Sequence, residues 1–201
     1  MSARTVRQGP QAGARRAIRP GLIGTASDLV LVAGHWLLRR PRADEAAQAL
    51  VMLSDPGVAM WNPARRVVDL DTAREWCERA ADWASGAHAT FSVVDPVDDR
   101  LVGNVSLFAI DAEHLTASVG YRVAPAERGR GVATAALAAV AEWALGPRGL
   151  ARVWLQHAVD NTASCTVATR AGFELEGTMR SASVYGDGRR HDDHLHARTR
   201  T

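Results

Sequence analysis

The segment that decides the fold is Val119-Gly120-Tyr121-Arg122-Val123-Ala124-Pro125, which continues into Arg128-Gly129-Arg130-Gly131-Val132-Ala133. It predicts a strand that ends at Pro125, a turn built on two glycines, and a long apolar helix from Gly131 to Leu145. Glycine lets the backbone approach a ligand closely and adopt dihedral angles that other residues resist. The first turn of a helix leaves backbone N–H groups unpaired, and the helix dipole makes that end positive. The junction therefore predicts a phosphate-binding site, of the kind that holds a pyrophosphate.

Two familiar phosphate-binding motifs do not fit this junction. A P-loop needs a Gly-Lys-Ser/Thr run, and the chain contains no lysine. A dinucleotide-binding fingerprint needs a third glycine where this chain has Thr134, within a repeated strand–helix–strand unit that occurs only once here. A glycine turn that merely reverses the chain is the alternative that two glycines alone leave open.

The composition limits the class of protein. A chain of 201 residues suits one domain with a substantial core. Its formal charge is only +2, and the chain lacks the dense basic stripe that is typical of a nucleic-acid-binding protein. The two cysteines, Cys77 and Cys165, cannot build a disulfide framework and favour a reducing cytoplasm. No apolar run approaches the roughly 18 residues of a membrane span, so we expect no membrane partner.

Residues 1–34 differ from the remainder of the chain. They combine five arginines with scattered glycine and proline, and Asp28 is their only acidic residue. A signal peptide is disfavoured because the apolar run 29–33 is short and Asp28 interrupts it. We expect a basic, disordered extension, or a start codon assigned too far upstream, followed by one domain over residues 35–201.

Hydrophobic periodicity predicts both strands and helices. Strands are expected at 36–40, 90–94, 101–110, 116–123, 152–158, 173–185 and 189–197, and helices at 44–53, 71–84, 131–145 and 162–170. Asp55-Pro56-Gly57 is expected to end the first helix as a turn. The helix from Gly131 is apolar nearly all round and should lie buried against a sheet. This order predicts an α/β fold with a mixed sheet.

Further stretches follow the glycine junction in a recognisable order. They are Asp160-Asn161-Thr162-Ala163-Ser164, then Ala171-Gly172-Phe173-Glu174-Leu175-Glu176-Gly177, then Tyr185-Gly186-Asp187-Gly188-Arg189-Arg190-His191-Asp192. With the loop at 128–133, they resemble the pyrophosphate loop, the N-x-x-S…A-G-F-x-x-E-G segment and the closing hairpin of the RimJ/RimL-like GNAT acetyltransferases. The resemblance spans residues 36–197. It implies a GNAT-like α/β fold with a mixed, mostly antiparallel central sheet flanked by helices.

The resemblance also implies a cosubstrate, acetyl-CoA, and no metal. The backbone amides of the loop would hold the pyrophosphate, and the backbone N–H of Val123 would stabilise the oxyanion of the acetyl group. The residues that the resemblance assigns to the coenzyme are Tyr121, Arg122, Val123, Arg128, Gly129, Arg130, Gly131, Val132, Ala133, Asn161 and Ser164.

Two of these residues carry a specific role by resemblance. Ser164 stands where RimL-like enzymes have a serine thought to protonate the departing sulfur of CoA, and a hydroxyl can donate that proton. Its alternative role is to stabilise the local backbone. Asn161 matches a residue that contacts CoA or orients the site, and its alternative role is to cap the helix over 162–170.

The resemblance fails at the general base. RimL-like relatives place glutamates where this chain has Ser118 and Ser183. The titratable candidates that remain are Glu113, His114, His157, His191 and Asp192. We expect His191 and Asp192, in the closing hairpin, to contact the acceptor, although a surface turn is the alternative. Trp61 and Asn62, between the first two helices, are expected in the acceptor wall, or as an anchor of that loop to the core.

The C-terminal histidines raise the question of a metal. On a strand, Asp192, His194 and His196 would share one face, but zinc needs three or four ligands that usually come from more than one element. We therefore expect a polar strand face and no metal. Cys165 could act as an acyl-accepting nucleophile with His157 as base, but a small buried residue is the commoner role.

The sequence thus predicts an N-acetyltransferase that moves an acetyl group from acetyl-CoA directly to a primary amine in a ternary complex. The amine would belong to a protein N-terminus or a small molecule, and the protein would be a cytoplasmic monomer or homodimer with no nucleic-acid partner. The absent carboxylates leave open a non-catalytic acyl-CoA-binding sensor on the same fold. A nucleic-acid-binding module has only the basic residues near the N-terminus to support it.

Overall fold

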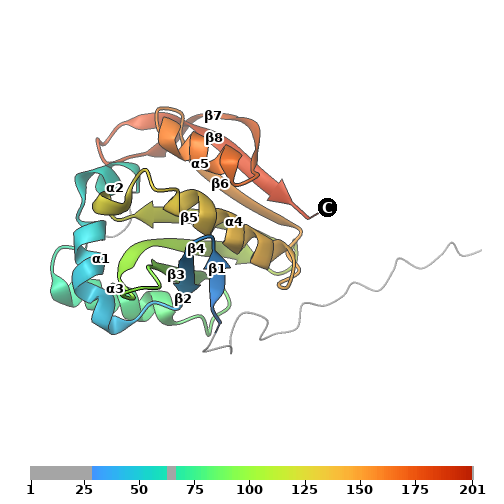
Figure 1. The fold of residues 1–201 in the computed structure, drawn as a ribbon. Helices are drawn as coiled ribbons and strands as arrows, with labels where there is room; N and C mark the ends of the chain where they lie inside the picture. Colours follow the sequence, from blue (N-terminus) through green and yellow to red (C-terminus); the bar gives the residue numbers. More distant parts are fainter. Residues whose placement is uncertain (1–28, 63–66, 201) are drawn as a thin grey trace, which may run out of the picture.

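The computed structural model describes residues 29–62 and 67–200, so most of the predicted extension lies outside the described residues. The chain folds around an eight-stranded sheet of order β1-β2-β3-β4-β5-β6-β8-β7 (Figure 1). Neighbouring strands are antiparallel except for β5 and β6, which confirms the predicted mixed, mostly antiparallel sheet. The strands are β1 (Leu31–Ala33), β2 (Trp36–Arg39), β3 (Ala89–Val94), β4 (Leu101–Asp111), β5 (Thr116–Val123), β6 (Arg152–Ala158), β7 (Glu174–Val184) and β8 (Arg190–Thr199).

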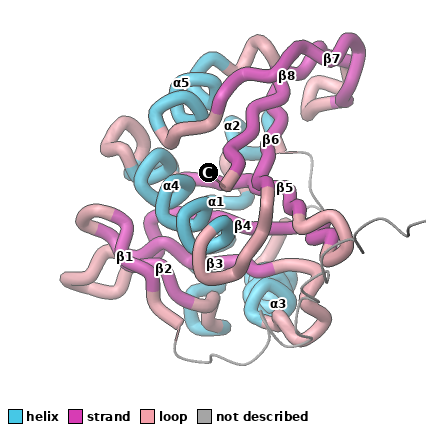
Figure 2. Tube along the Cα trace, turned by 90° about the vertical axis from the view of Figure 1, so that its right-hand side faces the viewer, coloured by secondary structure: helices cyan, strands magenta, loops and turns pink. Residues whose placement is uncertain are grey.

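Helices cover both faces of this sheet. They are α1 (Ala46–Leu53), α2 (Pro56–Trp61), α3 (Leu70–Ala81), α4 (Val132–Leu145) and α5 (Thr162–Arg170), with short 3-10 turns at Ala43–Glu45 and Pro125–Glu127. Figures 1 and 2 show α4 and α5 on one face and α3 on the other. Among the described residues, no helix combines the length and apolar character needed to cross a bilayer.

Two short elements correct the sequence expectations. Residues 31–33, assigned to a disordered extension, form β1, which pairs with β2 through a turn at Gly34 with φ +62°. Asp55-Pro56-Gly57, expected to be a turn, begins α2 instead. Asp55 Oδ1 accepts a hydrogen bond from the Val58 N–H at 3.0 Å, and Pro56 takes the first helical position, where its missing N–H costs nothing.

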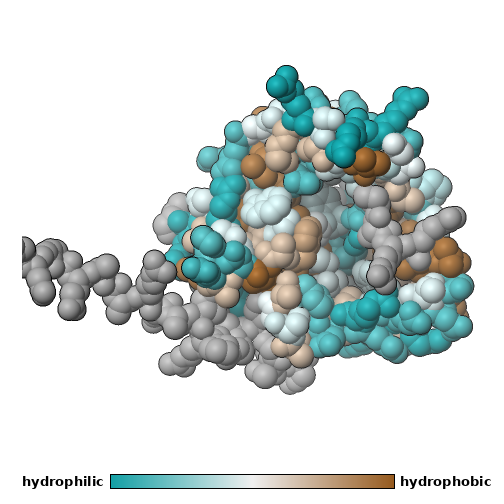
Figure 3. Space-filling view, turned by 180° about the vertical axis from the view of Figure 1, so that it is seen from behind, coloured by the Kyte–Doolittle hydropathy of each residue, from teal (hydrophilic) through white to brown (hydrophobic). Residues whose placement is uncertain are grey.

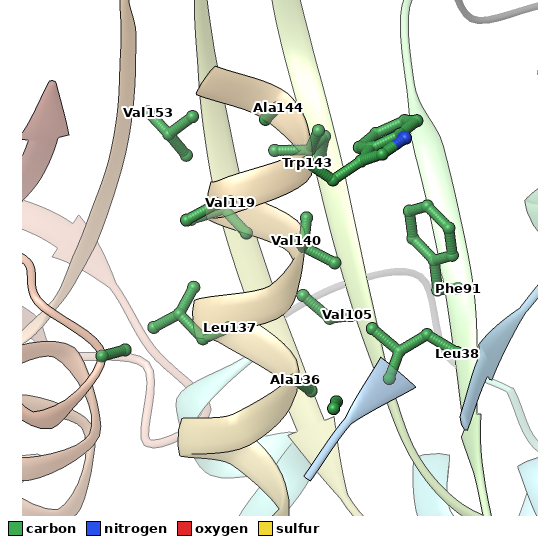
Figure 4. Packing of buried hydrophobic residues seen from close by; sticks show 14 of the residues in the cluster. Leu38, Phe91, Val105, Val119, Ala136, Leu137, Val140, Trp143, Ala144 and Val153 are labelled. Carbon is green, nitrogen blue, oxygen red and sulfur yellow. The ribbon is translucent and has the colours of Figure 1, made fainter. Parts of the chain in front are cut away.

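The core forms where α4 packs on the sheet, as its apolar sequence predicted. Leu137 and Val140 are fully buried against strand residues such as Leu38 (Figure 4). At the far end of α4, the rings of Trp143 and Phe91 meet edge to face with their centroids 5.3 Å apart. This packing fixes α4 against the sheet and so fixes the position of its N-terminus.

The parallel pair β5–β6 is open along most of its length. The strands pair only where residues 116–118 face residues 152–154, although β5 continues to Val123 and β6 to Ala158. Beyond Ser118 the facing edges of β5 and β6 are therefore not hydrogen-bonded to each other. The fold thus leaves a gap in the middle of the sheet, directly beside the N-terminus of α4.

Candidate functional site

A cavity of about 600 Å³ lies in this gap. Its walls come from β5, β6, the N-terminus of α4, the end of α2 and the first turns of α5. The structure brings together here almost all of the site residues that the sequence predicted: Trp61, Asn62, Tyr121, Arg122, Val123, Arg128, Gly129, Gly131, Val132, Ala133, Asn161 and Ser164. We call it the loop-side cavity.

The N-terminus of α4 opens into the loop-side cavity. Gly129 and Gly131 have φ angles of +76° and +84°, which only glycine adopts without strain. No side chain caps the helix, so the N–H groups of its first turn are free of a side-chain acceptor. The two glycines are also exposed, with no heavy atom within 4 Å of the position that a Cβ would take. A phosphate can therefore approach the backbone directly.

The charges around this helix end favour an anion. Arg122, Arg128 and Arg170 line the loop-side cavity, and Glu127 is the only acidic residue among the described lining residues. Glu127 is itself neutralised, since Arg100 and Arg130 both donate to its carboxylate. The contact with Glu127 directs the Arg130 side chain elsewhere, and Arg130 does not line the cavity.

The backbone of Val123 points into the gap. The Ala124 N–H donates to Val102 O at 2.9 Å, and Gly103 lies opposite Val123 across the β4–β5 ladder. Because successive N–H groups along a strand point to opposite edges, the Val123 N–H faces away from β4 and toward β6. It is therefore a backbone donor that a carbonyl oxygen inside the gap can reach.

Ser164 and Asn161 sit together at the start of α5. The Asn161 side chain accepts from the Ser164 N–H at 3.2 Å, which is the helix-capping role that the sequence allowed. Tyr121 donates from its hydroxyl to the Ser164 backbone carbonyl at 3.4 Å. Burial raises the pKa of Tyr121 to about 12, so this phenol stays protonated and keeps its donor role. These contacts fix the Ser164 backbone at the wall of the cavity.

Arg122 lines the loop-side cavity and also a second cavity, which is described below. Its guanidinium donates to Asn62 Oδ1 at 2.7 Å, and burial lowers its pKa to about 10, so it remains charged near neutral pH. Trp61 precedes Asn62 and packs edge to face on Tyr185, with the ring centroids 5.7 Å apart. Trp61 therefore joins the cavity wall to the closing hairpin, and Asn62 lines the cavity beside it.

A second cavity, also of about 600 Å³, opens on the other face of the sheet. Figure 3 shows this face hollowed near its middle. Gly120, Arg122 and Gln156 line both cavities, so the two meet through the β5–β6 gap. We call this one the α3-side cavity, since Trp76 and Arg79 of α3 line it. Ser118 and Ser183, where relatives have glutamates, line the α3-side cavity too.

A buried carboxylate stands behind Ser183, and the sequence analysis missed it. The Ser183 hydroxyl donates to Asp193 Oδ2 at 2.5 Å, and the Tyr185 hydroxyl donates to Asp193 Oδ1 at 2.9 Å. Asp193 is fully buried, so both of its oxygens are satisfied by these two hydroxyls. The available signal was the period of two in β8, which places Asp193 on the face opposite to that of Asp192.

The predicted acceptor residues in the hairpin lie elsewhere. His191 bonds to Asp160 at 3.1 Å and to Asp187 at 3.0 Å, and Asp192 accepts from the Ser181 N–H. Neither His191 nor Asp192 lines either cavity. The same is true of the base candidates Glu113 and His114, whereas His157 lines the loop-side cavity.

Comparisons with known proteins agree with this architecture. The RimJ structure of Mycobacterium smegmatis in complex with CoA-disulfide superposes with a TM-score of 0.75 at 26% identity, covering 86% of this chain and 88% of RimJ. The probable N-acetyltransferase YjcK of Bacillus subtilis is 37% identical over 45% of this chain, and the ribosomal-protein-serine acetyltransferase of Escherichia coli is 34% identical over 50% of it.

The match spans about half the length of these two curated relatives, 50% of YjcK and 56% of the Escherichia coli protein. A family model described as an acetyltransferase (GNAT) domain matches residues 35–174 of the chain. It covers β2 to β6, the glycine loop and helices α1 to α5. The chain belongs to the GNAT acetyltransferase family, with RimJ/RimL-like proteins among its relatives.

Proposed function

We propose that the protein is an acetyl-CoA-dependent N-acetyltransferase that transfers the acetyl group directly in a ternary complex. The observation that carries this proposal is the meeting of two cavities, on opposite faces of the sheet, at the β5–β6 gap. A coenzyme in one cavity and an amine in the other would bring their reactive ends together at that gap. Such positioning removes much of the entropic barrier of a two-substrate reaction.

The coenzyme would occupy the loop-side cavity. Its pyrophosphate would accept hydrogen bonds from the amides at residues 129–133, with Arg170 supplying positive charge, while Arg128 is paired with Asp55. The pantetheine arm would then lie along the unpaired edge of β5 and reach the Val123 N–H. This N–H would hold the thioester oxygen as it gains negative charge.

The acetyl transfer itself would use three hydroxyl-bearing or acidic side chains. The amine nitrogen attacks the carbonyl carbon, the carbon–sulfur bond breaks, and the departing sulfur takes a proton from Ser164, which regains one from solvent while Asp193 later releases the amine proton to solvent. The amine proton passes through Ser183, directly or through a water, to the buried carboxylate of Asp193. Asp193 thus supplies the negative charge that the serine at position 183 lacks, and this relay argues against a non-catalytic sensor.

The acceptor is proposed from the lining of the α3-side cavity. Among the described residues that line it there is no Asp or Glu, and Arg122, whose guanidinium bonds to the neutral Asn62, contributes positive charge, whereas Arg79 pairs with Glu75 of its own helix at 3.3 Å. A polyamine would be repelled by such a wall, whereas a peptide N-terminus followed by acidic residues would be attracted. The ribosomal-protein-serine acetyltransferase among the relatives supports a protein acceptor. We propose a monomer or homodimer in the cytoplasm, where the free thiols of Cys77 and Cys165 stay reduced.

The experiment is release of free CoA thiol from acetyl-CoA in the presence of three acceptors. These are a peptide with an acidic segment after its N-terminus, the same peptide with the acids changed to glutamine, and spermidine. The proposal predicts turnover in that order, highest with the acidic peptide. Tight acetyl-CoA binding without turnover on any amine would instead indicate a sensor.

The Asp193 relay has its own test. Asp193→Asn keeps the shape and removes the charge, so kcat should fall while KM for acetyl-CoA stays unchanged. Asp192→Asn, next to it on the opposite strand face, is the matched control and should retain the wild-type kcat. An unchanged kcat in Asp193→Asn would remove Asp193 from the reaction.

A further inference from the structure

Four potential metal ligands converge outside the proposed chemistry. The ligand atoms of His157, Cys165, His194 and His196 all lie within 4.8 Å of one another. We propose that these four side chains form a binding site for a divalent transition metal ion of the zinc class. We expected no metal from the sequence, because Asp192, His194 and His196 lie on a single strand and zinc ligands usually come from more than one element.

Three elements of the fold supply the ligands. His157 of β6 lies directly opposite His194 of β8 in the antiparallel ladder, and Leu155 lies opposite His196. His194 and His196 are two residues apart and so share a face of β8. Cys165 of α5 covers that face, with its Sγ 3.9 Å from His196 Nε2. Ligands from separate elements are the usual arrangement of a structural zinc site.

The imidazole nitrogens are short of partners. Within the described residues, His157 Nε2, His194 Nδ1 and His196 Nδ1 are buried and make no hydrogen bond. His157 and His196 are themselves only 5% and 1% exposed. Buried polar atoms normally have a partner, so the unpaired Nε2 of His157, whose other ring nitrogen is bonded to Ala158 O, points to an absent partner. A metal ion would satisfy nitrogens that face it.

The protonation states suit a metal. His157 Nδ1 lies 2.8 Å from Ala158 O, which fixes the proton on Nδ1 and leaves the lone pair on Nε2. On binding, the Cys165 thiol would release its proton to solvent and coordinate as a thiolate.

The distances require only a modest closure. Zinc–nitrogen bonds of about 2.0–2.1 Å and a zinc–sulfur bond of about 2.3 Å place tetrahedral ligand atoms about 3.3–3.7 Å apart. Ligand atoms within 4.8 Å of one another can reach that spacing if side-chain rotations bring each pair about 1 Å closer together. Three imidazoles and one thiolate form a set that suits zinc, cobalt and copper and disfavours magnesium or calcium.

The place of this cluster gives the metal a structural role. Cys165 follows Ser164 in α5, and His157 also lines the loop-side cavity. A bound ion would tie α5 to β6 and β8 and would hold the start of α5 at a fixed distance from the gap. Cys165 itself does not line the loop-side cavity, which is consistent with a ligand and not with an acyl-accepting nucleophile.

The test is Co²⁺ titration of the full-length, tag-free and coenzyme-free protein, after removal of metals by a chelator. We expect one equivalent of Co²⁺ to bind with a thiolate-to-cobalt charge-transfer band and the intense visible bands of tetrahedral cobalt. One equivalent of Zn²⁺ should displace it and raise the Tm. Binding should weaken as the pH falls, because protons compete for the thiolate and the imidazoles. Absence of the charge-transfer band in the wild-type protein would overturn the proposal.

The chain offers a clean control, since Cys77 is the only other cysteine. Cys77 is buried between α1 and α3, and its pKa is raised to about 11, so it is a poor ligand. Cys165→Ala should abolish the charge-transfer band and weaken Zn²⁺ binding at least about 100-fold, because even an outer-shell partner is worth roughly 10–100-fold. Cys77→Ala should keep both.

A histidine variant covers the case in which Cys165→Ala fails to fold. His194→Gln, at a half-buried position, should weaken Zn²⁺ binding to a similar degree, whereas His88→Gln, also half-buried but far from the cluster in the sequence, should not. Retention of the band in a folded Cys165→Ala protein, or equal losses in His194→Gln and His88→Gln, would place the metal elsewhere and refute the site.

Discussion

Gly131→Ala tests the glycine junction through backbone strain alone. Gly131 caps α4 with φ +84° and ψ 4°, and an added Cβ would meet no heavy atom within 4 Å. The substitution therefore causes no steric clash, but it makes a left-handed conformation cost roughly 1–2 kcal/mol. The free loop can relax from that conformation, whereas the coenzyme-bound loop must return to it. Since 1.4 kcal/mol is tenfold in an equilibrium constant, Kd for acetyl-CoA should rise about 5- to 30-fold.

The assay is isothermal titration calorimetry with acetyl-CoA, beside thermal unfolding of each variant. Gly149→Ala is the matched control, because Gly149 has φ +74° and its Cβ would only reach ordinary contact, 3.9 Å from the Arg200 guanidinium. Gly149 lies beyond the other end of α4, so this variant should lose similar stability and keep the wild-type Kd. If Gly131→Ala and Gly149→Ala had equal Kd values for acetyl-CoA, the β5–α4 junction would not be the phosphate-binding site, and the reasoning would be refuted.

Three other predictions concern the reaction, the core and pH. Ser164→Ala should lower kcat for acetyl transfer while leaving KM for acetyl-CoA nearly unchanged; steady-state kinetics check this, and an unchanged kcat would remove Ser164 from the reaction. Leu137→Ala, in the fully buried seam under α4, should cost about 2–5 kcal/mol of unfolding free energy in urea, and a cost below 1 kcal/mol would contradict the packing. Hydrogen bonds to Asp187 and Asp160 raise the pKa of His191, so its contribution to stability is complete below about pH 6.5 and is lost as the pH rises through the folded pKa. His191→Gln should flatten that dependence in thermal unfolding scans, and an identical slope would show that the pair does not form.

The features that sequence reasoning predicted well are local ones. The β5–α4 junction, the strand over 152–158 and the helix over 162–170 follow from hydrophobic periodicity, glycine positions and an Asn cap within a few residues. The structure places the same residues around one cavity because short connections keep neighbouring elements together. The family resemblance rests on this same local pattern.

The features that it missed depend on ambiguous or distant residues. Asp55-Pro56-Gly57 is compatible with both a turn and a helix start, and only the packing of α2 decides between them. The Ser183–Asp193 contact depends on the register of β7 against β8, which includes bulges that no periodicity reveals. Cys165 approaches His157 only after α5 folds back on β6 and β8.

A crystal structure of the protein with acetyl-CoA and a slowly reacting acceptor peptide tests the central claim most directly. The account predicts the pyrophosphate on the amides of residues 129–133, the thioester oxygen within hydrogen-bonding distance of the Val123 N–H, and the peptide amine entering from the α3-side cavity. Coenzyme density outside the β5–β6 gap, or both substrates entering from one face of the sheet, would contradict it.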